Sequence, residues 1–169
     1  MNLQYFPDFL SKEDQELTIS KTLYSKNWQF GHSSADNDSF HFWSIDLTKD
    51  PFFSNTILNK ICETVGINLR LIKVYANGQT YGQSGSVHKD LHNGDCDLTF
   101  LYYPLIWKPI YAGHLILDDG QEVISVLPKE NLGLMFKSDI DHVGMEPSRH
   151  YKELRISIAF KMKVEKRNV

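Results

Sequence analysis

Short hydrophobic runs separated by turn residues dominate the chain from residue 69 onward. Runs of this length that are rich in β-branched and aromatic residues are typical of β-strands. They predict strands over residues 69–75, 97–103, 113–117, 123–127, 132–136 and 154–164. Asp118-Asp119-Gly120 predicts a hairpin turn between two of these strands. Because no helical period lies between the strands, the pattern favours an antiparallel sandwich or jelly roll over a βαβ arrangement.

Helices are predicted only in the first part of the chain. Ser11 precedes an acidic residue three positions later, which is the capping-box pattern, and indicates a helix over residues 12–25. Hydrophobic residues at helical spacing predict a second helix over residues 54–65, and Gly66 supplies its stop. The small polar residues 31–39 predict a loop.

The length of 169 residues suits a single domain. We expect one domain over residues 1–169, of the mainly β (α+β) class. Its core is a jelly roll over residues 69–164, and residues 1–68 form a helical N-terminal support. With 41% hydrophobic and 23% charged residues, the composition excludes a disordered chain, a collagen and a coiled-coil rod.

The net charge of −3 disfavours nucleic acid as the main partner, because a protein that holds a phosphate backbone is normally basic. The basic residues near the C-terminus, Lys161, Lys163, Lys166 and Arg167, are interpreted as a solvated strand end and tail. The start of the chain shows no signal peptide, and no apolar run has the length of a membrane span. Cys62 and Cys96 are interpreted as thiols of a reducing compartment. We therefore expect a soluble cytoplasmic protein with no membrane partner.

His88-Lys89-Asp90 places an imidazole and a carboxylate two positions apart. On an extended segment these two side chains point from the same face, so both can reach one ion. His142 follows the predicted strand over residues 132–136, and a jelly roll can bring such distant strand ends together. Two histidines and one carboxylate form the facial triad of non-haem Fe(II) oxygenases. Zinc accepts the same ligands, so the triad alone leaves the metal open.

Arg155 lies in a strand whose alternation puts Arg155, Ser157 and Ala159 on one face. An arginine that points inward is costly unless an anion meets it. A guanidinium binds a carboxylate through two parallel hydrogen bonds, and the Ser157 hydroxyl can add a third. A structural partner such as Glu153 is the alternative to a bound ligand.

Two tyrosines fall where a small dicarboxylic acid would need hydrogen-bond donors. Tyr75 ends a predicted strand before an expected turn at Asn77-Gly78-Gln79, and Tyr103 ends another predicted strand. Tyr103 shares its face with Thr99 and Leu101. Packing in the core is the alternative explanation for either tyrosine.

The ordered set His88-x-Asp90, His142 and Arg155-x-Ser157 resembles the 2-oxoglutarate- and Fe(II)-dependent dioxygenases. Four further stretches are similar to the prolyl 4-hydroxylase branch, especially its short phage and bacterial members. They are Tyr75-Ala-Asn-Gly-Gln-Thr-Tyr81, Leu98-Thr-Phe-Leu-Tyr-Tyr-Pro104, Ala112-Gly113-His114-Leu115 and Arg155-Ile-Ser-Ile-Ala-Phe160. The chain departs from the branch where relatives often have Gly-Gly-Glu and this chain has Ala112-Gly113-His114. It also has the extra residues that follow Asp90.

The resemblance implies a double-stranded β-helix with the metal at its open end. It implies His88, Asp90 and His142 as metal ligands. It implies a 2-oxoglutarate site formed by Arg155, Tyr75 and Tyr103, with Leu101 and Leu115 as apolar walls and Thr99 and Ser157 as further contacts. Trp107 and Trp43 are candidates for the substrate rim. His92 and His114 are expected beside the site or at the surface, and not as ligands.

The implied cofactors are Fe(II), 2-oxoglutarate and O2, with ascorbate as a further candidate. The implied reaction hydroxylates a prolyl residue in a peptide or protein and releases succinate and CO2, in the host cytoplasm if the protein is encoded by a phage. Two alternatives stay open. One is a metal- or sugar-binding jelly-roll module without oxygen chemistry, and the other is an oxygenase with the same triad that acts on nucleic acid or on a small molecule.

Overall fold

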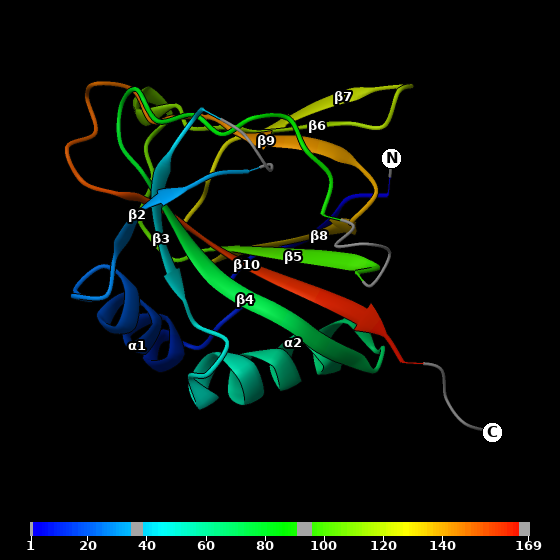
Figure 1. The fold of residues 1–169 in the computed structure, drawn as a ribbon. Coiled ribbons are helices and arrows are strands. Elements are labelled where there is room, and N and C mark those ends of the chain that lie inside the picture. The colour runs from blue at the N-terminus through cyan, green and yellow to red at the C-terminus, as the bar shows by residue number, and fades with distance from the viewer. Residues whose placement is uncertain (1, 35–38, 91–95, 166–169) are drawn as a thin grey trace.

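The computed structural model describes residues 2–34, 39–90 and 96–165, which form two antiparallel sheets (Figure 1). The seven-stranded sheet has the order β1-β8-β5-β10-β4-β3-β2, and the three-stranded sheet has the order β7-β6-β9. The strands of the large sheet are β1 (Gln4–Phe6), β8 (Leu132–Lys137), β5 (Leu98–Tyr103), β10 (Arg155–Val164), β4 (Leu69–Gln79), β3 (Phe42–Asp46) and β2 (Gln29–His32). Those of the small sheet are β7 (Val123–Val126), β6 (Leu115–Asp118) and β9 (Asp141–Gly144).

The helices lie on the side of the large sheet that faces away from the small sheet (Figure 1). They are α1 (Lys12–Thr22), the π-helical turn η1 (Phe52–Ile57) and α2 (Leu58–Val65); a short 3-10 turn, η3 (Pro109–Tyr111), precedes β6. The Ser11 hydroxyl caps α1 by accepting the backbone N–H of Asp14 at 3.1 Å. Gly66 ends α2 in the left-handed conformation, with a φ of 68°. None of the helices in residues 2–34, 39–90 and 96–165 is long and apolar enough to cross a membrane.

Strand β10 lies in the middle of the large sheet and separates the core from the cavity. Its residues Ile156, Ile158, Phe160 and Met162 are buried in one hydrophobic cluster with Phe53, Ile57 and Ile61 from the helical layer. The alternate residues Arg155, Ser157, Ala159 and Lys161 line a cavity on the opposite face. Fully burying each large apolar side chain contributes roughly 1.5–3 kcal/mol, so this pattern fixes which face of β10 meets the cavity.

The alternation predicted for Arg155, Ser157 and Ala159 is therefore confirmed. Two other sequence expectations differ from the structure. Residues 1–68 supply the helices but also β1, β2 and β3 of the large sheet. These strands are only three to five residues long, and β2 is largely exposed, so they lack the hydrophobic alternation that marks a strand. The expected loop over residues 31–39 begins inside β2, and its residues 35–38 lie outside the described part of the chain.

The expected turn at Asn77-Gly78-Gln79 is wrong, because β4 continues through these residues to Gln79. Gly78 allows the Trp28 ring to pack closely against this strand. A Cβ atom at this position would lie 2.8 Å from the Trp28 ring, so only glycine allows the ring to cover the strand.

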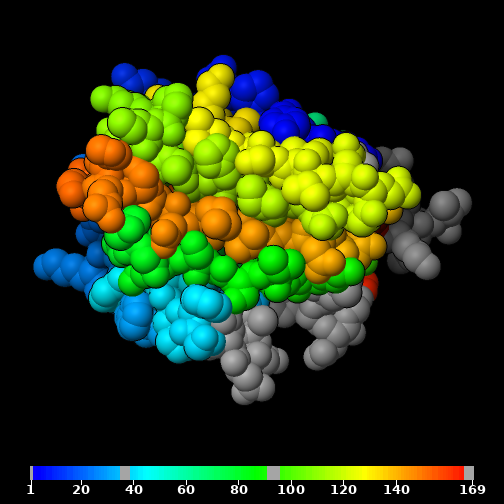
Figure 2. Space-filling view, turned by 90° about the horizontal axis from the view of Figure 1, so that it is seen from above, coloured from blue at the N-terminus to red at the C-terminus, as the bar shows by residue number. Residues whose placement is uncertain are grey.

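The small sheet forms much of the face seen from above, on the side away from the helices (Figure 2). The segment that leads to Asp90, green in Figure 2, runs beside it. A backbone hydrogen bond of 3.0 Å from Gly85 to Gly144 joins this segment to the end of β9. The segment is therefore held along the edge of the small sheet, over the cavity.

Candidate functional site

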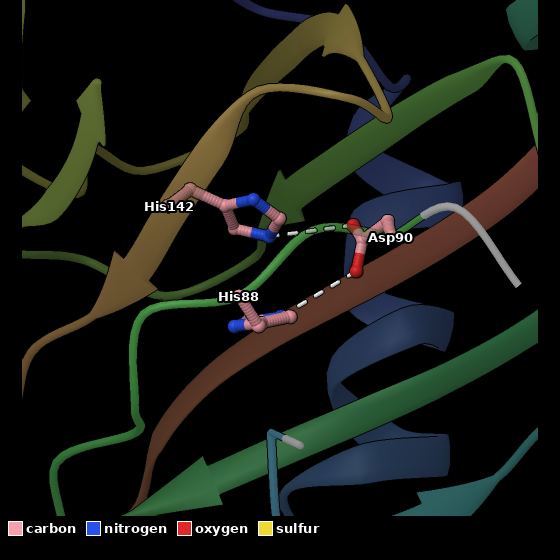
Figure 3. Close-up of side chains that lie close together, drawn as sticks. All are labelled: His88, Asp90 and His142. Atoms are coloured by element: carbon pink, nitrogen blue, oxygen red, sulfur yellow. Dashed lines mark ion pairs between the residues drawn. The ribbon is translucent and has the colours of Figure 1, made fainter. Parts of the chain in front are cut away.

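The two histidines that the sequence singles out are locked to each other through their backbones. The N–H of His88 donates to the His142 carbonyl at 3.0 Å, and the N–H of His142 donates back to the His88 carbonyl at 2.9 Å. The N–H of Asp90 donates to the Ser138 carbonyl at 2.8 Å. These bonds fix the segment from His88 to Asp90 against β9, and all three side chains point toward one another (Figure 3).

The three side chains have the geometry of a metal site. The Nε2 atom of His88 lies 3.4 Å from Oδ1 of Asp90, and Nε2 of His142 lies 3.3 Å from Oδ2. All three ligand atoms lie within 4.8 Å of one another. Neighbouring ligands bound to one ion at about 2.1 Å are roughly 3 Å apart, so these atoms fit one face of a single ion.

Backbone carbonyls set the tautomers of both imidazoles. Nδ1 of His88 lies 2.9 Å from the Ser86 carbonyl oxygen, and Nδ1 of His142 lies 3.0 Å from that of Ile140. Because a carbonyl oxygen can only accept, each Nδ1 carries the hydrogen, and each Nε2 keeps a lone pair for a metal. Burial also lowers the pKa of His142 against the opposing effect of Asp90, which favours the neutral form that binds metals.

Asp90 is held by two partners that approach the same carboxylate oxygen. The Thr99 hydroxyl donates to Oδ2 at 2.8 Å, and the Lys161 ammonium group contacts the same atom. Burial alone would raise the pKa of Asp90, but Lys161, His142 and His88 together lower it well below its ordinary range. Asp90 is therefore an ionised carboxylate that can bind a cation through Oδ1.

The interpretation of Lys161 as part of a solvated strand end is wrong, because this side chain is only 1% exposed. Lys161 stands in phase with Arg155, Ser157 and Ala159 along β10, so it shares their cavity-facing side. Continuing the period-2 pattern of this strand for one more step would have identified it.

Arg155 is buried and has no carboxylate partner among the described residues. Its Nε donates to the Gly113 carbonyl at 2.7 Å, and Nη1 donates to Oε1 of Gln79 at 2.8 Å. No acidic side chain in the described part of the chain lies within ion-pair distance of it, and Glu153, the alternative partner, is exposed. A guanidinium has five N–H donors, so these bonds fix its plane and leave donors for an anion.

The Tyr103 hydroxyl is a second buried donor for which the described residues offer no well-placed acceptor. Among the described residues, only the Tyr103 hydroxyl and Oδ1 of Asn77 are buried polar side-chain atoms without a hydrogen-bond partner of acceptable geometry. The Arg155 guanidinium carbon lies 5.5 Å from the centre of the Tyr103 ring. Both residues and the triad line one cavity of about 620 Å³. A small dicarboxylate fits this arrangement, with one end at a triad-bound metal and the other at Arg155 and Tyr103.

Comparison with known proteins shows which fold carries this site. No family model and no curated protein sequence matches the chain. One similar solved structure is a prolyl hydroxylase from Trichoplax adhaerens in complex with a hypoxia-inducible factor oxygen-degradation-domain peptide fragment. It superposes on this chain with a TM-score of 0.71 at 19% sequence identity, and the match covers 95% of this chain and 82% of that one. The chain has the prolyl hydroxylase fold.

Two further neighbours of the same fold agree. A Pseudomonas putida prolyl-4-hydroxylase gives a TM-score of 0.68 at 12% identity, covering 97% of this chain and 93% of that one. The collagen prolyl hydroxylase of Paramecium Bursaria Chlorella virus-1 gives 0.63 at 13% identity, covering 96% of both. The expected resemblance and the mainly β jelly-roll fold with N-terminal helices are confirmed.

Within the prolyl hydroxylase fold, the cavity gathers most of the residues that the sequence singled out. Those that line it are His88, Asp90, His142, Arg155, Tyr75, Tyr103, Leu101, Leu115 and Ser157. Thr99 does not line it and instead donates to Asp90, so a contact of Thr99 with 2-oxoglutarate stays a prediction. Sequence reasoning missed Gln79, Lys73 and His32, which also line the cavity.

The two candidate rim tryptophans lie elsewhere. Trp107 donates from Nε1 to the Ala112 carbonyl at 2.9 Å and packs on Tyr151, and Trp43 packs on Phe30. Neither is among the residues that line the cavity, so a role for them at the rim stays a prediction. His114 does not line the cavity either, and His92 lies outside the described residues.

Proposed function

We propose that this protein is a 2-oxoglutarate- and Fe(II)-dependent dioxygenase that hydroxylates a prolyl residue in a peptide or protein. The observation that carries the proposal is one cavity with two complementary ends. A triad of two histidines and a carboxylate lines it together with a buried arginine that has no acidic partner among the described residues. The fold of the solved prolyl hydroxylases and 2OG-Fe(II) oxygenases supports the same assignment.

The residues of the cavity would have different roles in such a reaction. His88, Asp90 and His142 would hold the metal and leave three coordination positions open. Arg155 and Tyr103 would hold the far carboxylate of 2-oxoglutarate, and the walls formed by Leu101 and Leu115 would exclude water. Fe(II), 2-oxoglutarate and O2 supply the oxidation itself, which hydroxylates the substrate and leaves succinate and CO2.

Two observations support a peptide or protein as the substrate. The Trichoplax adhaerens neighbour is described in complex with a peptide fragment. The net charge of −3 disfavours a nucleic-acid substrate. A non-catalytic metal- or sugar-binding module would have no use for a buried arginine aimed into the metal cavity.

The test is succinate formation from 2-oxoglutarate with Fe(II), ascorbate, O2 and proline-containing peptides. We expect a peptide to stimulate turnover. Arg155→Met should weaken 2-oxoglutarate binding and so raise the concentration that gives half-maximal turnover at least about tenfold, which is the value of one charge-assisted pair. Arg149→Met is the matched control, because Arg149 is exposed and contacts Tyr81 away from the cavity.

Two results would contradict the proposal in different ways. If a free amino acid or a nucleic acid stimulates turnover and no peptide does, the substrate class is wrong. If no succinate forms with any substrate and Arg155→Met leaves 2-oxoglutarate binding unchanged, the protein is not an oxygenase of this kind.

A further inference from the structure

Two lysines face each other across the strands that form the floor of the cavity. Lys161 on β10 and Lys73 on β4 are directly paired in the antiparallel register. Both line the cavity, and their ammonium nitrogens lie 5.6 Å and 5.2 Å from the centre of the same Tyr75 ring. Like charges directly opposite each other across two strands are destabilising. Such a pair therefore needs a negative charge for each lysine.

Only one of these lysines has its counter-charge within the described structure. Lys161 contacts Asp90, and Thr99, its register partner on the other side, donates to the same carboxylate oxygen. Lys73 has no carboxylate within ion-pair distance among the residues that the structure describes. The backbone N–H of Thr48 donates to Oδ1 of Asp46 at 2.9 Å and lowers the pKa of this carboxyl, and Lys73 lowers it further. Asp46 itself is exposed.

His32 of β2 lies on the same side of the cavity as Lys73. Its ring centre is 5.4 Å from that of Tyr75, and both residues line the cavity. Burial lowers the pKa of His32, and the charges of Lys73, His88 and Lys161 lower it further. His32 is therefore a neutral hydrogen-bonding group beside an ammonium group that no carboxylate of the described residues pairs with.

Most of the charged residues that line the cavity are cationic, which also favours an anionic ligand. Among its described lining residues, Asp90 is the one acidic side chain, whereas Arg155, Lys161, Lys73 and Lys89 are cationic. Lys89 pairs with Asp141 at 3.6 Å. A divalent metal and the doubly negative 2-oxoglutarate would cancel each other, and Lys161 would cancel Asp90. Arg155 and Lys73 would then remain, so the cavity stays positive after the co-substrate has bound.

We propose that Lys73 and His32 form a subsite for an anionic group of the substrate, so that the hydroxylated peptide carries an acidic side chain next to its target residue. The inference rests on the proposed function and names its substrate class. A carboxylate and a phosphate share the chemistry that an ammonium group and an imidazole recognise. An acidic peptide would supply the negative charge that the described residues do not offer to Lys73, and it would relieve the repulsion between the two lysines.

The test measures peptide binding to the protein loaded with Mn(II) and 2-oxoglutarate, so that no turnover is needed. The probes are four pools of proline-containing peptides, each labelled with an uncharged dye. The pools differ in the residue next to proline, which is Glu, Gln, Lys or phosphoserine. We expect the Glu pool to bind about tenfold tighter than the Gln pool, the value of one charge-assisted contact, and the Lys pool to bind weakest. The phosphoserine pool distinguishes phosphate from carboxylate as the preferred anion.

Lys73→Met should reduce the preference for Glu over Gln to less than twofold. Lys60→Met, an exposed lysine on α2, should leave it unchanged. The melting temperature of the peptide-free Lys73→Met protein should stay the same or rise, because the substitution removes a like-charge neighbour of Lys161. A lower melting temperature would indicate that Lys73 stabilises the fold and has no unmet charge.

Equal binding of the Glu and Gln pools, a preference that survives in Lys73→Met, or no binding of any pool would overturn the subsite. An oligonucleotide that binds more tightly than every peptide pool would overturn the peptide assignment. Lys73-dependent binding of acidic peptides without succinate formation in Fe(II) and O2 would instead contradict the proposed function and leave the subsite intact.

Discussion

The Lys161 ammonium group contacts the carboxylate of Asp90, and both side chains are almost fully buried, at 1% and 5% exposure. This ion pair joins β10 to the segment that carries His88 and Asp90. It keeps Asp90 charged in the absence of a metal and directs Oδ1, which Lys161 and Thr99 do not occupy, toward His88.

Lys161→Met should therefore lower the stability of the metal-free protein more than that of the metal-bound protein. Removing one partner of a buried pair leaves an uncompensated charge and costs about 3 kcal/mol. In urea unfolding with EDTA we expect a loss of this size, and Mn(II) should restore much of it because the cation neutralises Asp90.

Two variants control that measurement. Lys152→Met removes an exposed lysine and should change neither curve. Asp90→Asn combined with Lys161→Met removes both charges of the pair, so it should be more stable without metal than Lys161→Met alone. An identical loss with EDTA and with Mn(II) would show that the pair has no connection to the metal.

Thr99→Val should weaken metal binding without unfolding the protein. The substitution keeps the shape of the side chain and removes the hydroxyl that holds Oδ2 of Asp90 at 2.8 Å. Losing a group that orients a metal ligand typically costs about 10- to 100-fold in affinity. Titration with Mn(II), followed by electron paramagnetic resonance, measures this, and the exposed Thr64→Val is the control. Unchanged affinity would mean that Lys161 alone positions Asp90.

Residues whose chemistry is constrained could be predicted from the sequence. His88, Asp90 and His142 stand out because few residue types bind metals, and Arg155 stands out because a charge in an apolar strand needs a partner. The residue type does not reveal Lys161 or Lys73, because lysine is common at strand ends. Lys161 could have been found by continuing the period-2 pattern of β10, whereas the burial of Lys73 depends on the strands beside it. The Lys73–Lys161–Thr99 row exists only once the register of β4, β10 and β5 is known.

The fold was predicted best where hydrophobic strands are long. The strands of the jelly-roll core follow from periodicity, except for the four-residue β9. The strands β2 and β3 are also short, and they join the sheet because β3 pairs with β4 and β2 pairs with β3. Glycine was ambiguous in the sequence. Gly78 was interpreted as a turn but makes room for Trp28, whereas Gly120 does lie in the hairpin, with a φ of 82°.

Gly113→Ala should weaken 2-oxoglutarate binding and leave metal affinity unchanged. A Cβ atom at Gly113, whose φ is 71°, would lie 2.9 Å from Cδ of Arg155, so the guanidinium must move. We expect at least about a tenfold loss of affinity in calorimetry of the Mn(II) protein. Gly120→Ala introduces the same backbone strain, but its Cβ atom would have no neighbour within 4 Å. This variant should therefore lower the stability and leave 2-oxoglutarate affinity unchanged. Equal effects of the two variants would contradict the role of Gly113.

Tyr102 should make the fold sensitive to alkali. Burial raises the pKa of Tyr102 above its ordinary value of about 10, and its hydroxyl donates to Oδ1 of Asn131 at 2.9 Å. Because the folded state holds this proton more tightly, its contribution to stability is complete below pH 10 and declines as the pH rises above it. Tyr102→Phe should lose about 1 kcal/mol at pH 8 but decline less steeply above pH 10 in urea unfolding.

The exposed Tyr24→Phe serves as the control for that profile, since its side chain is 74% exposed. If Tyr102→Phe follows the wild-type curve above pH 10, the hydroxyl does not contribute to the alkaline loss of stability.

A crystal structure of the protein grown with Mn(II) and 2-oxoglutarate tests the central claim most directly. We expect one metal ion bound by His88, Asp90 and His142, with 2-oxoglutarate chelating it and its far carboxylate meeting Arg155 and Tyr103. A metal bound elsewhere, or a 2-oxoglutarate molecule that does not reach Arg155, would contradict the account.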